Sequence, residues 1–112
     1  MDDFDALHIA DGVIQRFVYE SPDLQVHVKD WREQVLTLAF KDVIGLEGIN
    51  VGYGDLSHAT EEGRGSFLER CCAVAGEAAS EFRCYSFFWA DPEESTLRIV
   101  ARCCVLVQAS DG

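Results

Sequence analysis

The sequence predicts an α+β domain, an antiparallel sheet of five or six strands with one helix packed on one face. Apolar and polar residues alternate in several segments, as they do in half-buried strands, and one segment alone has the apolar spacing of a helix. Because strands and helix are segregated along the chain, α+β is favoured over parallel α/β, and a small partly closed β-barrel is the alternative. The 112 residues, 48% of them hydrophobic, suit a single domain over residues 1–112.

The first 41 residues predict a loose acidic arm and a three-stranded meander. Residues 1–11 contain four Asp and no Lys or Arg. Three apolar side chains are able to attach this arm to the core: Phe4, Leu7 and Ile9. Three strand-like segments follow, at residues 13–20, 24–28 and 34–40. Turns are expected between them, at Ser21-Pro22-Asp23 and at residues 30–33.

The middle of the chain predicts a short irregular strand, a long loop and the helix. Glycines interrupt the apolar residues 43–51, and glycine weakens a strand. Residues 50–65 are expected to form the longest loop, and long loops in compact domains are often functional. The helix is expected over residues 67–79, where apolar residues recur at helical spacing. Ser66 and Glu69 have the spacing of a capping box at its start.

The last part of the chain predicts a long hairpin of residues 82–90 and 96–108, with a turn at 91–95. The second strand is expected to be continuous, with one apolar face: Leu97, Ile99, Ala101, Cys103, Val105 and Val107. If Phe88 faces the core, alternation turns three aromatic residues outward: Tyr85, Phe87 and Trp89. Exposed Tyr and Trp are enriched at binding hot spots. The alternative is that a loop or the arm covers them.

The charge of the chain excludes two classes of partner. Twenty Asp and Glu face nine Lys and Arg, and the net charge is -11. Nucleic acids and anionic membranes are bound through Lys and Arg, so neither is expected as a partner. No apolar run approaches the ~20 residues of a membrane-spanning helix. A basic protein would be attracted, although negative charge also keeps a small domain soluble without any partner.

The five cysteines indicate a reducing, cytosolic compartment. Their number is odd, two pairs are adjacent, and the acidic start of the chain does not resemble a secretory signal. Cys71 and Cys103 are expected in the core, with Cys104 and one of Cys72 or Cys84 exposed enough to oxidise. Neighbours on a strand point to opposite faces, so Cys103-Cys104 does not suit zinc. No metal site and no cofactor are expected.

No catalytic constellation is recognisable, so we expect no catalytic residue and no enzyme. His58 would be the base for a cysteine nucleophile, but nothing in the sequence pairs it with a particular cysteine. The residues expected to bind a partner form an acidic group and the aromatic group. They are Asp55, His58, Glu61 and Glu62, and Tyr85, Phe87 and Trp89.

Several stretches resemble a family of small single-domain bacterial proteins, some of them immunity proteins encoded beside toxins. The resemblance lies in Leu7-His8 with Gly12-Val13-Ile14, in LTLAFKDVIGL at residues 36–46, in residues 82–106 with LRIVA, and in Asp55-Leu56-Ser57-His58 and Phe67-Leu68-Glu69-Arg70. It spans most of the chain and transfers no catalytic residue. Members commonly have an acidic residue directly after the histidine matching His8, whereas Ile9-Ala10 precede Asp11 here, so no role is assigned to His8.

Three functions follow as hypotheses. The leading one is an immunity-type inhibitor that binds and neutralises a basic toxin, because such a toxin and an acidic inhibitor are electrostatically complementary. The second is a structural subunit that forms a homodimer through the outward face of Tyr85, Phe87 and Trp89. The third is a small ligand-binding protein or enzyme that uses the loop over residues 50–65 with His58.

Overall fold

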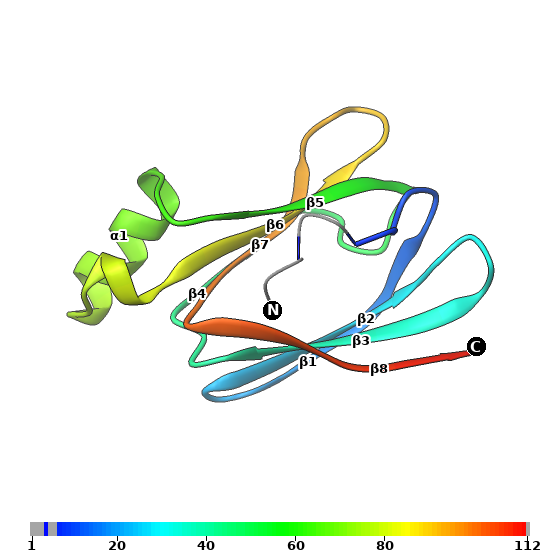
Figure 1. The fold of residues 1–112 in the computed structure, drawn as a ribbon. Helices are drawn as coiled ribbons and strands as arrows, with labels where there is room; N and C mark the ends of the chain where they lie inside the picture. The colour runs from blue at the N-terminus through cyan, green and yellow to red at the C-terminus, as the bar shows by residue number, and fades with distance from the viewer. Residues whose placement is uncertain (1–3, 5–6, 112) are drawn as a thin grey trace.

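The computed structural model describes residue 4 and residues 7–111, apart from the side chains of residues 108–111. These residues form two facing β-sheets with a short helix at one end (Figure 1). The strands are β1 (Val13–Glu20), β2 (Asp23–Lys29), β3 (Gln34–Lys41), β4 (Gly45–Gly48), β5 (Leu56–Glu62), β6 (Arg83–Trp89), β7 (Ser95–Ala101) and β8 (Cys103–Asp111). The helix α1 (Ser66–Ala75) and the 3-10 helix η2 (Ala79–Glu81) lie between β5 and β6 along the chain.

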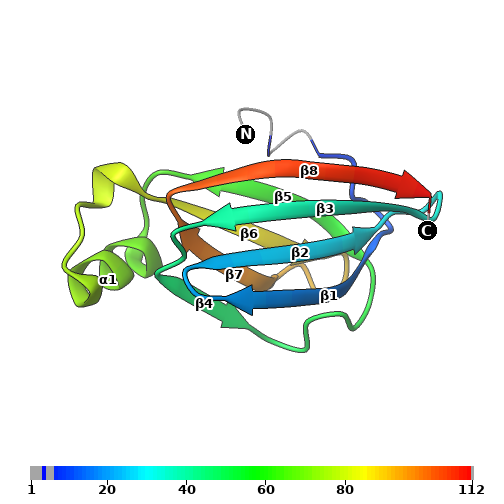
Figure 2. The ribbon, with the colours of Figure 1, turned by 90° about the horizontal axis from the view of Figure 1, so that it is seen from below.

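Each sheet has four described strands, in the orders β1-β2-β3-β8 and β4-β7-β6-β5, and every pairing is antiparallel. The α+β class, the meander of β1, β2 and β3, and the hairpin of β6 and β7 are therefore confirmed. The strands divide between two layers instead of forming one sheet of five or six (Figure 2). Both sheets have two edge strands, so neither closes into a barrel.

The segment expected to be one strand, residues 96–108, is β7 and β8, which belong to different sheets. Arg102 is the residue between them, and there the chain leaves one layer for the other (Figure 1). Its backbone N–H donates to the Lys41 carbonyl oxygen at 2.9 Å, which fixes the crossing at the end of β3. The crossing reverses the expected alternation: Cys104 is buried and Cys103 is exposed.

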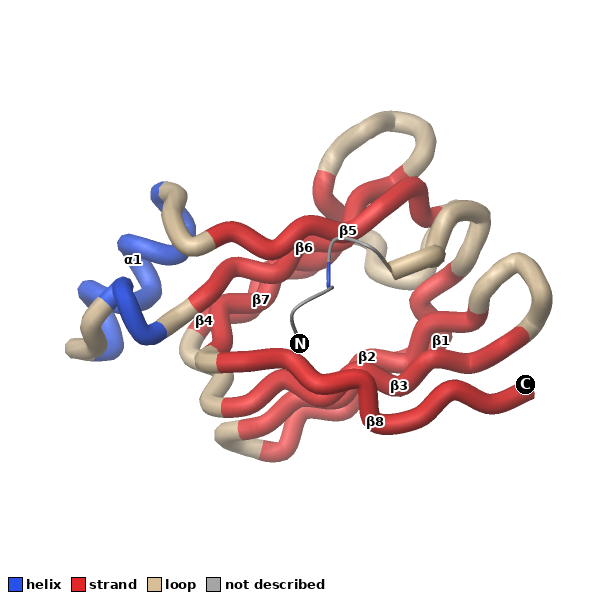
Figure 3. The backbone as a smooth tube through the Cα atoms, in the orientation of Figure 1, coloured by secondary structure: helices blue, strands red, loops and turns tan. Residues whose placement is uncertain are grey.

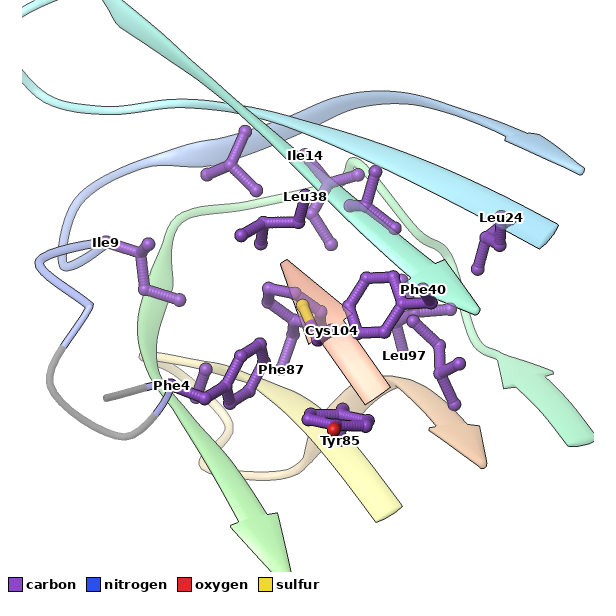
Figure 4. Packing of buried hydrophobic residues seen from close by; sticks show 14 of the residues in the cluster. Phe4, Ile9, Ile14, Leu24, Leu38, Phe40, Tyr85, Phe87, Leu97 and Cys104 are labelled. Atoms are coloured by element: carbon purple, nitrogen blue, oxygen red, sulfur yellow. The ribbon is translucent and has the colours of Figure 1, made fainter. Parts of the chain in front are cut away.

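The main core fills the space between the sheets. Inward residues of β3, such as Leu38 and Phe40, meet Tyr85 and Phe87 of β6 (Figure 4). A second cluster lies on the other face of the β4-β7-β6-β5 sheet, where α1 covers it: Leu68, Cys72, Phe82, Cys84 and Val100. Both faces of β6 are therefore buried near the helix.

The expected loose arm is packed where the structure describes it; residues 1–3, 5 and 6 lie outside the described part. Phe4 and Ile9 are completely buried. The Phe4 ring meets Phe40, Tyr85 and Phe87 edge to face, with centroids 6.2, 4.9 and 5.7 Å apart (Figure 4). This arrangement suits aromatic quadrupoles. Because Phe40 belongs to one sheet and Tyr85 to the other, Phe4 links the two layers.

The helix is shorter than expected and begins differently. Gly65 is the N-cap, Ser66 is already helical, and no side chain caps this end, so the predicted capping box is wrong. The helix ends at Ala75 because Gly76 adopts a left-handed conformation, with φ at 73°. The Glu77 backbone N–H then donates to the Cys72 carbonyl oxygen at 2.9 Å.

Candidate functional site

The aromatic group expected to face outward is turned inward. Tyr85 is 1% exposed and Phe87 is completely buried, so the prediction of an outward binding face is wrong for both. The alternative that the arm covers them is confirmed, since Phe4 contacts both rings. Trp89 is 9% exposed, yet it lines a surface cleft. The homodimer surface proposed from these three residues therefore does not exist in that form.

The predicted loop over residues 50–65 contains a strand. β5 pairs with β6 from Leu56 to Glu62, which leaves residues 49–55 as the loop before it. His58 stacks on the Phe88 ring with centroids 4.6 Å apart. Its Nδ1 lies 3.1 Å from the Ser57 hydroxyl oxygen. These contacts position the imidazole within the sheet surface.

The acidic residues expected to bind a partner together with His58 are not gathered around it. Glu61 forms an ion pair with Arg83 at 3.0 Å. Glu62 is exposed at the helix-proximal end of β5, and Asp55 is exposed before its other end. The four residues of the acidic group are thus spread along one edge strand and do not form a single site.

The buried cysteines lack the features of a reactive nucleophile. Cys72, Cys84 and Cys104 are buried, and this burial raises the pKa of the first two thiols and that of Cys104 to about 12. A raised pKa keeps a thiol protonated, and the thiolate is the reactive form. Within the described residues no hydrogen bond joins a cysteine to a histidine. The residue expected to be exposed, Cys104, is buried, and Cys103 is exposed in its place.

Among the described residues, negative charge is concentrated at the end of the sandwich away from α1, which we call the loop end. It consists of residues 7–12, 30–33, 49–55 and 90–94 (Figure 3). Two backbone hydrogen bonds hold segments 7–12 and 90–94 beside the start of β5: Asp11 N–H donates to the Leu56 carbonyl oxygen at 2.9 Å, and Ala90 N–H donates to the Asp55 carbonyl oxygen at 3.0 Å.

The loop end carries more than half of the net charge. Its seven acidic residues, against Arg32, give a net charge of -6 out of the -11 of the chain. They are Asp11, Asp30, Glu33, Asp55, Asp91, Glu93 and Glu94. The connections at the helix end (residues 21–22, 42–44, 63–82 and 102) contain four acidic residues and three Arg, for a net charge of -1.

Two of the seven carboxylates at the loop end are paired. Burial acts to raise the pKa of Asp30, but hydrogen bonds from the backbone N–H groups of Gln34 and Arg32 and the Arg32 side chain hold that pKa below its ordinary value. Glu33 lies 3.6 Å from the Lys29 ammonium group. The other five are exposed and have no ion-pair partner among the residues that the structure describes.

A cleft of about 180 Å³ opens between two loops of the loop end. It is lined by Asn50, Tyr53, Gly54, Trp89, Asp91 and Pro92. Tyr53 is 75% exposed, whereas the Trp89 indole is nearly buried, so the cleft runs from solvent towards the core. A Cβ at Gly54 would stand 3.9 Å from Trp89 Cδ1, and the positive φ of 81° there disfavours other residues.

Sequence reasoning missed most of this arrangement. It selected Asp55 and Trp89 but treated residues 91–95 as a turn and residues 50–65 as one long loop, and it did not bring the two together. The available signal was that residues 42–63 and 84–97 contain no Lys or Arg. That signal becomes informative only when the two loops are known to be neighbours, which needs the β4-β7-β6-β5 strand order.

Further features restrict the chemistry of the described residues. No group of three or more His, Cys, Asp or Glu side chains is placed to hold a metal ion among them. No helix in this part of the chain is long and apolar enough to span a membrane.

Comparisons with models of protein families, with curated proteins and with solved structures gave no match. The resemblance to immunity proteins therefore stays a prediction.

Proposed function

We propose that this chain is a non-enzymatic cytosolic binding protein, an immunity-type inhibitor that binds a basic toxin through its loop end. The observation that supports the proposal most is the position of the charge. A net charge of -6 is gathered on four connecting segments, and the opposite end carries -1. A charge spread evenly for solubility would not need this asymmetry.

The state of the five carboxylates without partners also supports binding through this surface. An exposed carboxylate that already has an ion-pair partner must break that pair before it meets another protein. Asp55, Glu93 and Glu94 are exposed and have no such partner among the described residues, so they are available to a basic surface. Complementary charge accelerates association and disfavours acidic partners more than it adds affinity.

The proposal predicts that neutralising the loop end weakens binding selectively. The test variant combines Asp55→Asn, Glu93→Gln and Glu94→Gln, which removes three charges and leaves the cleft lining unchanged. An exposed ion pair contributes about 0.2–1 kcal/mol, so the dissociation constant should rise about 3- to 150-fold. The measurement is capture from lysate of cells that produce the protein, followed by titration of the purified partner at low and moderate salt.

The matched control removes three exposed carboxylates elsewhere: Glu20→Gln, Glu62→Gln and Glu69→Gln. This control should bind like the original chain, and expression of the captured partner alone should arrest growth unless the chain is expressed with it. Equal weakening by both variants would show that only total charge matters. A partner that is acidic, or harmless when expressed, would contradict the inhibitor proposal.

A second candidate function is self-association through β8, because this edge strand lacks the usual protection. β8 is nine residues long and lies at the edge of its sheet, and residues 103–110 contain no charged residue. Unprotected apolar edges pair readily with another strand. We expect light scattering over a range of concentrations to show a dimer that Val107→Lys dissociates. A monomer at every concentration would remove this candidate, and the charge of -11 on each copy opposes it.

A further inference from the structure

The cleft at the loop end has the dimensions of a site for one side chain. Its volume of about 180 Å³ is below the ~300 Å³ at which pockets for small organic ligands begin. Its lining combines two aromatic side chains, Tyr53 and Trp89, with the Pro92 ring. Such rigid surfaces serve as contact points in protein interfaces because they lose little conformational entropy on binding.

The charge around the cleft selects the kind of side chain. The Asp91 carboxylate belongs to the lining, and Asp55, Glu93 and Glu94 lie on the same two loops. No Lys or Arg occurs in residues 42–63 or 84–97, so these loops supply no cation of their own. A guanidinium or ammonium group over a Trp or Tyr ring is attracted by the ring quadrupole, and a neighbouring carboxylate adds a charge-assisted hydrogen bond.

We propose that this cleft receives one arginine or lysine side chain of the protein partner, with the aliphatic stem against Tyr53 and Trp89 and the cationic group at Asp91. The inference rests on the proposed function, since it names the contact through which the loop end would hold a basic protein. An apolar or proline side chain would fill the same volume but would leave the surrounding carboxylates without a counter-charge. The charge of the rim therefore favours the cationic occupant.

The experiment needs no knowledge of the partner. The isotope-labelled protein is titrated with N-acetyl-arginine methylamide while the two tryptophan indole N–H signals are followed by NMR. Trp31, which is 67% exposed and lies outside the cleft lining, is an internal control, and Trp31→Phe assigns the two signals. We expect a saturable shift at Trp89 and none of similar size at Trp31. The dissociation constant should be on the order of 1 mM, because one capped residue makes few contacts.

Matched ligands and variants make the result specific. The citrulline analogue has nearly the same shape without the charge, and it should bind at least fivefold more weakly. Tyr53→Ala and Asp91→Asn should each weaken binding of the arginine probe at least fivefold, whereas Glu20→Gln, which removes an exposed charge at the opposite end of the sandwich, should change it less than twofold. Equal binding of arginine and citrulline, preferential binding of a capped proline, or shifts without saturation would each overturn the proposal.

This result can be separated from the test of the proposed function. If a basic partner is captured but Tyr53→Ala leaves its affinity unchanged, the cleft proposal fails and the loop-end proposal stands. If the arginine probe binds as expected but no basic partner is captured, the cleft is a cation site and the inhibitor proposal fails.

Discussion

Replacing Phe4 with alanine is expected to lower the free energy of unfolding by about 3–5 kcal/mol. The ring is completely buried and makes edge-to-face contacts with three aromatic rings from both sheets. Its loss removes apolar burial, removes these contacts and leaves a cavity that the surrounding strands cannot fill without moving. Since small domains are stable by about 5–15 kcal/mol, this one change would remove a large part of the total.

The measurement is urea denaturation, with the midpoint and the slope determined for each variant. Phe17→Ala is the matched control, because Phe17 is 43% exposed on edge strand β1 and its truncation should cost about 1 kcal/mol. A cost for Phe4→Ala as small as that of the control would mean that the arm is not part of the core. The expected difference would show that a segment which reads as a loose tail closes the space between the sheets.

The success of the sequence reasoning in the meander has a physical cause. β2 has one face on the core and one on solvent, so Leu24, Val26 and Val28 alternate with polar residues and the buried face is evident. Alternation over residues 34–40 is equally clear, and these strands pair as expected. A strand with only one covered face shows that face in its sequence.

The sequence predictions were wrong for strands that do not have one covered face and one face on solvent. β6 is covered on one face by the opposite sheet and on the other by α1, so apolar residues occur on both of its faces and alternation cannot assign Tyr85 to either face. The run from β7 to β8 keeps its alternation in sequence while the chain changes layer at Arg102. β5 is a polar edge strand in which Leu56 and Ala59 are the buried residues, so it reads as loop.

The candidate site could not be predicted from the sequence for a related reason. Composition shows the negative charge of the chain, but only the fold places it at one end. Asp55 and Ala90 are distant in sequence and are joined because β5 and β6 are neighbours whose ends carry the two loops. The aromatic cleft also depends on the inward turn of β6, since Trp89 reaches the surface only at the end of that strand.

Gly12 couples the arm to the start of β5, and Gly12→Ala is expected to lower the free energy of unfolding by about 1–3 kcal/mol. A Cβ at this position would stand 2.8 Å from the carbonyl oxygens of both Ile9 and Lys29, which are backbone atoms and cannot rotate away. The Gly12 carbonyl oxygen also accepts the Leu56 N–H at 2.8 Å, so relief of the clash must move the start of β5.

The control for this prediction is Gly63→Ala, where the added Cβ meets only the guanidinium of the Arg83 side chain, which is able to move. Gly63→Ala should therefore change the denaturation midpoint little, while Gly12→Ala lowers it. Because Asp55 directly precedes Leu56, Gly12→Ala should also shift the NMR signals of residues 49–55, far from the altered side chain in sequence. A Gly12→Ala protein with unchanged midpoint and unchanged loop signals would show that the arm and the loop over residues 49–55 are independent. In that case the position of the acidic surface would depend on the two sheets alone.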